Sequence, residues 1–214
     1  MIKLKDVSAV ILCGGYGTRL KEILQPGQPK AMADIHGRPF IEILMNRLIT
    51  YRFKQYLLCT GYGEDYLRFW LDCWLDSKKV RVTLQPDISD TECSGTFLAA
   101  FNAAIWLSGD FFVINGDTYC EIDYRAVFER HQDSGVLATV CVDKNGINTG
   151  TMILSRRALD LGFSKSVKSI EEVLGVIVLA SERLLECQVD TDYYDIGTPE
   201  GLAVFRNIME ARTL

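Results

Sequence analysis

Histidine is scarce in this 214-residue chain, and several common sequence features are missing altogether. The two histidines, His36 and His131, stand far apart and share no metal-ligand spacing with the cysteines, which argues against a structural zinc site. No apolar run approaches the roughly 18 residues of a membrane span. The N-terminal residues are too polar for the apolar region of a signal peptide.

An excess of positive charge is also missing. The chain has 23 Lys and Arg against 28 Asp and Glu, a formal net charge of −5, whereas a nucleic-acid-binding protein normally carries a basic stripe. We therefore expect no nucleic-acid partner, although a few well-placed cations can still bind a small anionic ligand. The hydrophobic fraction of 48% excludes a disordered chain and suits one well-buried domain.

The cysteine pattern contains no C-x-x-C pair. Seven cysteines are scattered along the chain, at positions 13, 59, 73, 93, 120, 141 and 187. An odd number at such spacings fits buried free thiols in a reducing compartment better than a disulfide framework. We therefore expect a cytoplasmic protein with no membrane partner.

Short apolar runs alternate with helical patterns through the first half of the chain. Residues 9–13, 56–59, 80–84 and 111–114 are typical of strands that are covered on both faces. Three stripes at helical spacing lie between them: Phe40, Ile43, Leu44, Leu48 and Tyr51; Tyr66, Phe69, Trp70 and Cys73; and Phe97, Ala100, Phe101 and Ala104. This alternation predicts βαβ units and a three-layer α/β fold.

The second half predicts further strands over residues 136–142, 149–154, 184–189 and 193–196. Asn145-Gly146 is a tight-turn signal between the first two. A short helix is expected over residues 169–174, and Thr198-Pro199-Glu200 has the cap, the proline and the acidic residue of a helix start. No repeat or linker divides the chain, so we expect a single domain over residues 1–214.

The last predicted helix leaves the oligomeric state open. Its apolar positions are Leu202, Val204, Phe205, Ile208 and Met209. These side chains can pack on the chain's own sheet, which we favour, or on a second subunit of a homodimer.

The first predicted strand leads into a glycine-rich loop, Gly14-Gly15-Tyr16-Gly17-Thr18-Arg19. Glycines at this point let the backbone approach a phosphate group closely and offer it N–H donors. In an open α/β sheet, ligands bind beyond the carboxyl ends of the strands, which is where this loop lies. It has neither the dinucleotide spacing nor the Gly-Lys-Ser/Thr of a Walker loop. Alone, it is equally consistent with a turn that binds nothing.

Arg19 and a later Pro29-Lys30 pair add two cations to this loop, and the proline fixes the backbone ahead of the lysine. Together they resemble the signature of the sugar-phosphate nucleotidyltransferases, L-x-G-G-x-G-T-R-L followed by Pro-Lys-Pro. Here it reads Leu12-Cys13-Gly14-Gly15-Tyr16-Gly17-Thr18-Arg19-Leu20, and Pro29-Lys30-Ala31 lacks the second proline. The resemblance implies a three-layer αβα sandwich with a mostly parallel, Rossmann-like sheet of the nucleotide-diphospho-sugar transferase type.

The resemblance continues along nearly the whole chain. Gln85-Pro86 resembles the family's base-reading position, and Gly95-Thr96 is similar to its Gly-Thr-x-Gly-Ala-Leu, although Leu98 replaces the later glycine. Asn115-Gly116-Asp117 resembles the metal-binding Gly-Asp that follows a strand, although by itself it is a common turn. Asp195 resembles the second metal-binding aspartate. The tail around it and the Leu-Cys-Gly-Gly start are most similar to heptose 1-phosphate guanylyltransferases.

The resemblance implies Mg²⁺-dependent transfer of a nucleoside monophosphate from a nucleoside triphosphate, with GTP favoured, to a sugar 1-phosphate such as heptose 1-phosphate. Because the attacking oxygen is already anionic, the protein's work is positioning and charge neutralisation. Arg19, Lys30 and Asp117 would be catalytic, and Asp117 and Asp195 would hold Mg²⁺. The implied nucleotide-binding residues are Leu12, Cys13, Gly14, Gly15, Gly17, Thr18, Gln85, Gly95, Thr96, Asn115 and Gly116.

The acceptor side departs from the family's pattern. The Arg-Tyr-Gly of relatives does not occur, and Asn148-Thr149-Gly150 follows Asp117 closely. Asp143-Lys144 is the nearest substitute for the family's Glu-Lys pair, although such a pair is more often a solvated hairpin corner. We predict Lys144, Asn148 and Gly150 as acceptor-binding residues in a shortened region, about residues 119–214, which follows a nucleotide half of about residues 1–118.

Two interpretations remain open at this point. The chain is an active transferase with a more open acceptor pocket, for heptose 1-phosphate or for another phosphate acceptor. Alternatively, it binds nucleotide with weak or no turnover, as a regulatory or partner subunit. The survival of all four catalytic and metal-binding side chains favours the enzyme, whereas Ala31 and Leu98 count against it.

Overall fold

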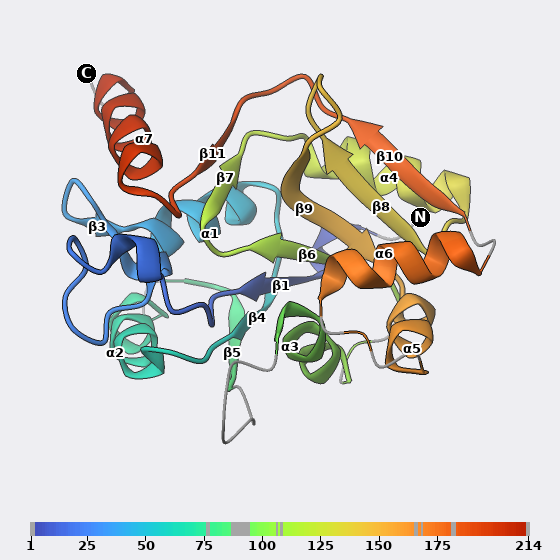
Figure 1. Cartoon of the computed structure of the whole chain (residues 1–214), viewed down its shortest axis with the longest axis horizontal. Coiled ribbons are helices and arrows are strands. Elements are labelled where there is room, and N and C mark those ends of the chain that lie inside the picture. Colours follow the sequence, from blue (N-terminus) through green and yellow to red (C-terminus); the bar gives the residue numbers. More distant parts are fainter. Residues whose placement is uncertain are drawn as a thin grey trace.

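The computed structural model describes residues 3–75, 78–86, 95–105, 107, 109–164, 167, 169–180 and 183–212. Within these residues, the centre of the molecule is a seven-stranded sheet in the order β10-β8-β9-β6-β1-β4-β5 (Figure 1). The strands are β1 (Ser8–Leu12), β4 (Gln55–Cys59), β5 (Arg81–Gln85), β6 (Phe111–Asn115), β8 (Ala138–Val142), β9 (Asn148–Leu154) and β10 (Leu184–Gln188). Only β9 runs antiparallel to its neighbours, which confirms the mostly parallel sheet.

Helices cover both faces of this sheet and complete the three predicted layers. Along β1, Ala9 and Ile11 face a core shared with α1, α2 and α4, whereas Val10 faces a core shared with α3, α5 and α6. This alternation is the two-residue period of a strand that is buried on both faces. The helices are α1 (Phe40–Thr50), α2 (Glu64–Leu75), α3 (Gly95–Ala104), α4 (Tyr124–Ser134), α5 (Arg156–Ser164), α6 (Ile170–Leu179) and α7 (Pro199–Ala211).

Two small sheets flank the main one. β7 (Thr118–Cys120) pairs antiparallel with β11 (Tyr193–Asp195), and β2 (Asp34–Ile35) pairs with β3 (Arg38–Pro39). The described residues also form three short 3₁₀ turns: Leu4–Asp6, Thr18–Leu20 and Lys30–Met32. The β7–β11 pair brings the end of the chain back to the centre of the fold, which matters for the site below.

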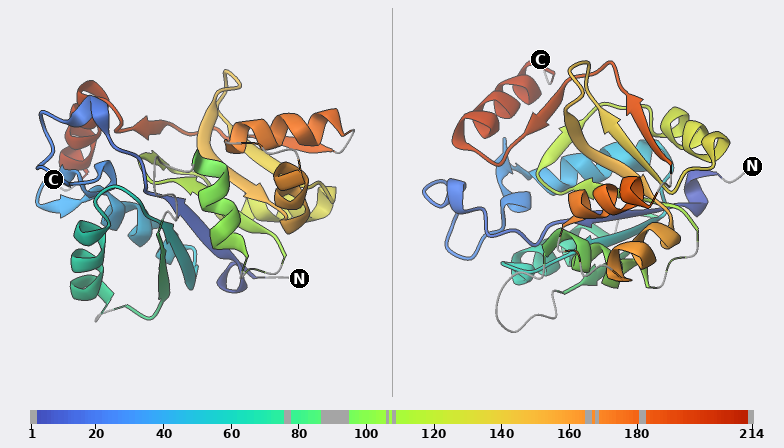
Figure 2. Two further views of the ribbon diagram at one scale, coloured as in Figure 1. Left: turned by 60° about the horizontal axis from the view of Figure 1, so that its bottom comes forward. Right: turned by 45° about the vertical axis from the view of Figure 1, so that its right-hand side comes forward.

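The final helix, α7, begins as predicted. The hydroxyl of Thr198 accepts a hydrogen bond from the N–H of Gly201 at 3.1 Å, and Pro199 occupies the first turn. Leu202 and Phe205 are fully buried, and the Phe205 ring centroid lies 5.3 Å from that of Phe40. This face of α7 therefore packs within its own chain, against the small sheet and α1. In Figure 1 and in the left view of Figure 2, α7 and α6 lie at opposite ends of the molecule.

The predicted apolar face of α2 is wrong in part. The helix buries Leu67, Leu71 and Trp74, whereas Phe69 is 75% exposed. Both sets have helical spacing, so spacing alone cannot choose between them. Packing chooses the face: Leu67, Leu71 and Trp74 belong to the core that β1 and α1 share. The Tyr66 hydroxyl stays on the surface, where it donates to the carbonyl oxygen of Pro26 at 3.2 Å.

Helices α4, α5 and α6 differ from the prediction, whereas the described cysteines agree with it. Helices α4 and α5 were not expected, and α6 continues to Leu179, well beyond the predicted short helix. Six cysteines lie in the described part of the chain and all six are free thiols, as expected; Cys93 and the side chain of Phe97 lie outside the described residues. None of the helices in these ranges is both long and apolar enough to cross a membrane.

Candidate functional site

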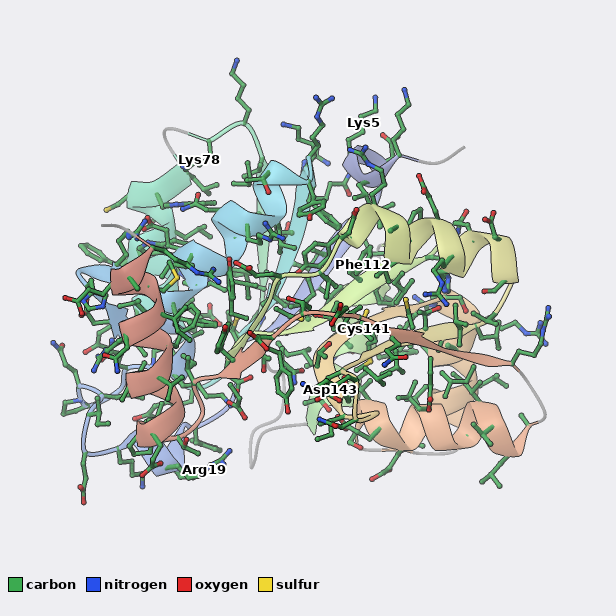
Figure 3. All side chains as sticks on the ribbon, turned by 90° about the horizontal axis from the view of Figure 1, so that it is seen from above. Lys5, Arg19, Lys78, Phe112, Cys141 and Asp143 are labelled. Atoms are coloured by element: carbon green, nitrogen blue, oxygen red, sulfur yellow. The ribbon has the colours of Figure 1, made fainter. Side chains whose placement is uncertain are left out.

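The loops that carry the predicted site residues gather at one edge of the main sheet. β1, β4, β5, β6 and β8 run in the same direction, so the segments that follow them emerge at the same side. Figure 3 shows the result: Lys5, which precedes β1, and Arg19, which follows it, lie at opposite sides of the molecule. Asp143, which follows β8, lies on the side of Arg19. This is the edge at which open α/β sheets bind ligands.

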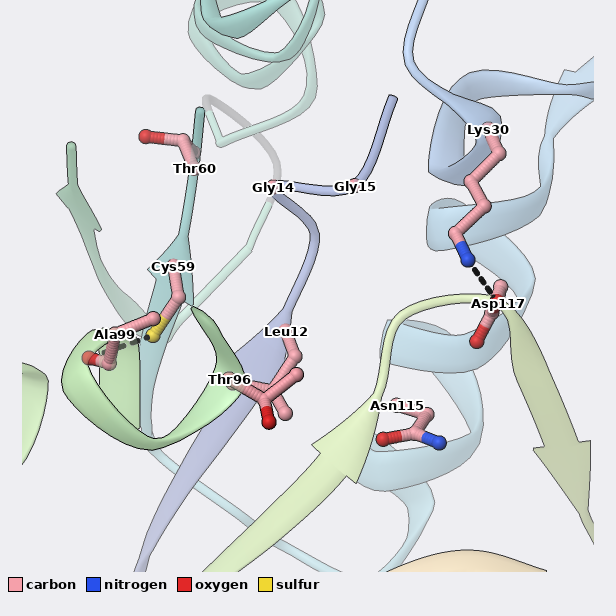
Figure 4. Close-up of a pocket in the computed structure, with 10 residues that line it drawn as sticks. All are labelled: Leu12, Gly14, Gly15, Lys30, Cys59, Thr60, Thr96, Ala99, Asn115 and Asp117. Carbon is pink, nitrogen blue, oxygen red and sulfur yellow. Dashed lines mark hydrogen bonds and ion pairs between the residues drawn. The ribbon is translucent and has the colours of Figure 1, made fainter. Parts of the chain in front are cut away.

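A cavity opens at this edge between β1, β4, β6 and α3. It is lined by Leu12, Gly14, Gly15, Lys30, Cys59, Thr60, Thr96, Ala99, Asn115 and Asp117 (Figure 4). Most of these residues were predicted as nucleotide-binding or catalytic residues. Cys59, Thr60 and Ala99 also line the cavity but were not predicted as site residues. The position of Cys59 and Thr60 at the end of the second predicted strand is a signal that could have found them. Ala99 offers no such signal.

The glycine loop is held between β4 and Lys30. A β-carbon on Gly14 would lie 3.3 Å from the carbonyl oxygen of Thr60, and one on Gly15 would lie 3.4 Å from Cε of Lys30. Gly17 adopts a φ of 60°, a backbone conformation that favours glycine. Figure 4 shows Gly14 and Gly15 between Thr60 on one side and Lys30 on the other. The absence of side chains therefore lets the lysine and the loop backbone approach each other closely.

Lys30 and Asp117 form an ion pair inside this cavity, marked by the dashed line in Figure 4. Their side chains are only 21% and 14% exposed, respectively. The other carboxylate oxygen of Asp117 accepts a hydrogen bond from the hydroxyl of Thr118 at 3.3 Å. Asp117 is thus held in place from two sides, beside the glycine loop.

The second predicted metal-binding residue, Asp195, is brought to Asp117 by the small sheet. In the β7–β11 pair, Asp195 stands opposite Thr118, and the N–H of Ile196 donates to the carbonyl oxygen of Asp117 at 2.9 Å. The carboxylate of Asp195 accepts from the N–H of Gly197 at 2.6 Å. The pairing therefore brings together two carboxylates that are distant in sequence, one directly before β7 and one at the end of β11.

Gly197 marks the point where the charged groups meet. A β-carbon built on it would lie 2.8 Å from Oδ1 of Asp195, 3.3 Å from Nη2 of Arg19 and 3.5 Å from Oδ2 of Asp117. Arg19 itself is exposed on the 3₁₀ turn that follows the glycine loop. The structure therefore brings together Arg19, Lys30, Asp117 and Asp195. Gly197, which keeps this small space free of a side chain, was not predicted as a site residue from the sequence.

Cys13 lies beneath the glycine loop and is buried. A β-carbon on Gly116 would come within 2.8 Å of its Sγ and within 2.7 Å of the carbonyl oxygen of Leu12. Burial, followed by the nearby Cys59 and Asp117, raises the pKa of the Cys13 thiol, and Lys30 only partly offsets this. The thiol is therefore neutral and packs as an apolar group, so only the backbone of Cys13 is available to a ligand.

The other predicted nucleotide-binding residues lie around the cavity with different roles. The carbonyl oxygen of Gln85 accepts from the N–H of Thr60 at 2.9 Å, which fixes the cavity wall although Gln85 is outside the lining. Thr96 lines the cavity and its hydroxyl accepts from the N–H of Ile170 at 3.2 Å. Gly95 is the first residue of α3, and Thr18 is exposed at the start of its 3₁₀ turn.

Two predicted acceptor residues, Asn148 and Gly150, lie beside the cavity at an irregularity in the β8–β9 pairing. Gly150 has a φ of 73°, and a β-carbon on it would lie 3.1 Å from Nδ2 of Asn115. The side chain of Asn148 accepts from the N–H of Gly150 at 2.9 Å. These residues therefore border the cavity through Asn115, which lines it.

Lys144 lies apart from this cavity, exposed in the turn between β8 and β9. It lines a second pocket with Asp143 and residues 189–193, the connection between β10 and β11. Because β8 and β10 end at the same edge as β1 and β6, both pockets open at one side of the sheet. The connection that borders the second pocket continues directly into β11 and Asp195.

Comparison with known proteins identifies the family to which the chain belongs. The sequence profile described as "MobA-like NTP transferase domain" matches residues 9–186. A D-glycero-alpha-D-manno-heptose 1-phosphate guanylyltransferase from Campylobacter jejuni is 26% identical over 219 residues, covering 91% of this chain and 96% of its own length.

Solved structures agree with this match. HddC from Yersinia pseudotuberculosis, crystallised with GMP-PN, is 27% identical with a TM-score of 0.79, covering 95% of this chain and 99% of that one. An inositol-1-phosphate CTP transferase from T. maritima shares the fold at 16% identity, with a TM-score of 0.80 and coverage of 98% and 97%.

Proposed function

The chain belongs to the family of MobA-like NTP transferase domains and is a nucleotidyltransferase, and we propose that it transfers GMP from GTP to heptose 1-phosphate in the presence of Mg²⁺. An oxygen of the acceptor phosphate attacks the α-phosphorus, and the bond from that phosphorus to pyrophosphate breaks. The products are a nucleotide sugar and pyrophosphate. Because the acceptor phosphate is already an anion, no side chain has to remove a proton.

The choice of GTP and heptose 1-phosphate is supported by two relatives. The name of the Campylobacter jejuni protein gives heptose 1-phosphate as the acceptor and guanylyl as the group transferred, and HddC was crystallised with GMP-PN. Both matches extend over more than nine tenths of this chain and therefore include the acceptor side as well as the nucleotide side. Other phosphate acceptors and other bases are the alternatives that an assay has to separate.

The observation that carries the proposal is the meeting of Arg19, Asp117 and Asp195 around Gly197, beside Lys30 and the glycine loop. Backbone N–H groups of the loop can bind phosphate oxygens, and Lys30 supplies a compact positive charge next to them. In our proposal Lys30 stabilises charge at the α-phosphate and Arg19 stabilises the departing pyrophosphate. Such fixed charges act mainly on the transition state, where negative charge develops on the leaving oxygens.

The two carboxylates fit Mg²⁺. Mg²⁺ prefers oxygen ligands and is commonly held by one or two carboxylates together with substrate phosphates and water. Asp117 and Asp195 supply such oxygens on either side of Gly197, and the described residues contain no larger group of His, Cys, Asp and Glu that would suit another metal. When bound, Mg²⁺ neutralises phosphate charge between the reactants. The ion pair with Lys30 holds the Asp117 carboxylate in place beside the glycine loop.

We also propose the reducing cytoplasm as the compartment. All six described cysteines are free, and five of them are buried. Burial raises the pKa of Cys59 to about 12, so its thiol stays protonated and unreactive at neutral pH.

The test is a substrate panel. The purified chain is incubated with Mg²⁺, each of the four nucleoside triphosphates, and heptose 1-phosphate, mannose 1-phosphate or glucose 1-phosphate, and pyrophosphate is measured. We expect the fastest release from GTP with heptose 1-phosphate. No release from any pair would contradict the transferase. If nucleotide still bound, that result would favour a nucleotide-binding partner subunit.

A further inference from the structure

Residues 60–63 connect β4 to α2 and contact two separate parts of the proposed triphosphate site. The segment reads Thr60-Gly61-Tyr62-Gly63, and it is anchored at its start by the hydrogen bond from the N–H of Thr60 to Gln85. At its end, the N–H of Tyr66 donates to the carbonyl oxygen of Gly63 at 3.1 Å, within the first turn of α2. The segment is therefore fixed to the sheet at one side and to a helix at the other.

The first contact of this segment is with the glycine loop. A β-carbon on Gly61 would lie 3.0 Å from the carbonyl oxygen of Gly14 and 3.3 Å from its Cα. Two backbones approach each other here at a distance that leaves little room for a side chain on either. The position of Gly14 is thus set by the segment that follows β4 as well as by β1.

The second contact is with the residues that lead into Lys30. Gly63 has a φ of 74°, and a β-carbon on it would collide with the carbonyl oxygen of Gly27 and lie 2.5 Å from Cδ of Pro29. Because Pro29 fixes the backbone directly before Lys30, this contact restrains where the lysine side chain begins. Gly63 is therefore required by both its conformation and its neighbours.

Tyr62 joins these two contacts. Its ring lies against that of Tyr16 in the glycine loop, with centroids 5.4 Å apart and planes tilted by 49°. Its hydroxyl oxygen accepts a hydrogen bond from the N–H of Gly27 at 3.1 Å. One side chain therefore contacts the glycine loop through its ring and the turn before Lys30 through its hydroxyl.

We propose that Tyr62 is a positioning residue for the triphosphate, which fixes the spacing between the glycine loop and Lys30. This inference rests on the proposed function, in which Lys30 faces the α-phosphate and the glycine loop, which leads into Arg19, faces the phosphates that leave as pyrophosphate. Only a triphosphate extends to both groups, whereas a monophosphate reaches Lys30 alone. A ligand that needs both groups at a fixed separation gains affinity when that separation is set before binding. Tyr62 therefore favours nucleoside triphosphate over monophosphate without touching either.

The test compares binding of triphosphate and monophosphate by calorimetry. Each of the four nucleoside triphosphates is titrated into the wild-type chain with Mg²⁺, and the tightest is then compared with its own monophosphate. Tyr62→Phe removes only the acceptor for Gly27 and is expected to weaken triphosphate binding about five-fold, the usual effect of one hydrogen bond. Tyr62→Ala also loses the ring contact and is expected to weaken it further. Monophosphate binding should change much less, so the preference for triphosphate falls.

Tyr51→Phe is the matched control. It too removes a hydroxyl that accepts one hydrogen bond, from Nη2 of Arg47 at 3.2 Å, but at the end of α1, away from the cavity. It should leave the triphosphate preference unchanged at a similar melting temperature. If Tyr62→Phe weakens both ligands equally, or neither, Tyr62 does not position the phosphate-facing groups and the inference is wrong.

The wild-type pyrophosphate assay separates this result from the proposed function. Release by the wild type, with an unchanged triphosphate preference in the Tyr62 variants, overturns the inference and leaves the function standing. A lost preference in a chain that releases no pyrophosphate supports the inference and overturns the function. A wild-type chain that binds none of the four triphosphates overturns both.

Discussion

Lys30 and Asp117, 87 positions apart in the sequence, form an ion pair inside the cavity at the carboxyl edge of the sheet. The pair places a positive charge and a carboxylate beside the glycine loop. Each partner has a second role in the proposed reaction, Lys30 toward phosphate and Asp117 toward Mg²⁺. Changing either one therefore affects both charge and position.

Asp117→Asn keeps the size of the side chain and removes its charge. We expect the rate of pyrophosphate release to fall by roughly 10²–10³-fold, about 3–4 kcal/mol of transition-state stabilisation. The initial rate at saturating substrates measures the loss, and a cooperative melting transition shows that the variant folds. The matched control is Asp133→Asn on the exposed side of α4, which should keep full activity. A wild-type rate in Asp117→Asn would refute its assignment as a metal ligand.

Gly197→Ala tests the space around which the charged groups meet. Its new methyl group would lie 2.8 Å from Oδ1 of Asp195 and 3.3 Å from Nη2 of Arg19, so one of them must move. Displacement of a reacting group by about 1 Å lowers rates by roughly 10²-fold, and we expect a kcat loss of that order. Steady-state kinetics of pyrophosphate release measure it.

Gly175→Ala is the control for this substitution, because a β-carbon there meets nothing within 4 Å. It lies within α6, where replacing glycine by alanine stabilises a helix by about 0.5–1 kcal/mol. Activity should be unchanged and the melting temperature slightly higher. Equal activity in Gly197→Ala and Gly175→Ala would show that the open space at Gly197 is irrelevant to catalysis.

More of the fold than of the candidate site could be predicted from the sequence. The strands of the parallel sheet could be predicted because they are covered on both faces and therefore consist of short apolar runs. Val10 in β1 and Val113 in β6, for example, are fully buried. Periodicity failed for α2, since two apolar faces compete there and only packing against the rest of the core chooses between them. Helix α4 was missed because its sequence is mostly polar and only a narrow stripe of it is buried.

The site could be predicted where a residue directly follows a strand, as for Gly14, Gly15 and Asp117. It could not be predicted where long-range pairing decides the position. The proximity of Asp195 to Asp117 depends on β11 pairing with β7, and no local pattern specifies that partner. The contacts of Gly61 and Gly63 are also long-range, because each glycine meets backbone from a different part of the chain.

Lys144→Ala tests whether the second pocket binds the acceptor. If the lysine contacts the acceptor, the KM for heptose 1-phosphate should rise roughly ten-fold, the usual loss for a hydrogen bond to a charged group, while the KM for GTP stays constant. Lys5→Ala removes a lysine at the opposite side of the molecule and serves as the control (Figure 3). An unchanged acceptor KM would make Lys144 a solvated residue of the hairpin turn.

The ionisation of Asp143, in the same turn, is expected to make the stability of the fold depend on pH. The N–H of Ile147, donated at 2.8 Å, is the main cause that lowers the pKa of Asp143 below its usual 3.8, and the N–H of Asn145 adds to it. Because the pKa of Asp143 is lower in the folded state than in the unfolded state, the ionised carboxylate stabilises the fold at pH values above the unfolded-state pKa. This stabilisation is lost as the pH falls through the folded-state pKa. Urea denaturation should show Asp143→Ala less stable than wild type at pH 7. The gap should close below about pH 3.8; a gap independent of pH would contradict the role of the charge.

Transfer of GMP to the phosphate of the acceptor can be followed by ³¹P NMR of the complete reaction. With GTP, Mg²⁺ and heptose 1-phosphate, the wild-type chain should convert the acceptor signal into the paired phosphorus signals of a nucleotide sugar. Pyrophosphate should appear in equal amount. Pyrophosphate accompanied by free GMP, or an acceptor signal that never changes, would show that GMP is not transferred to the acceptor phosphate.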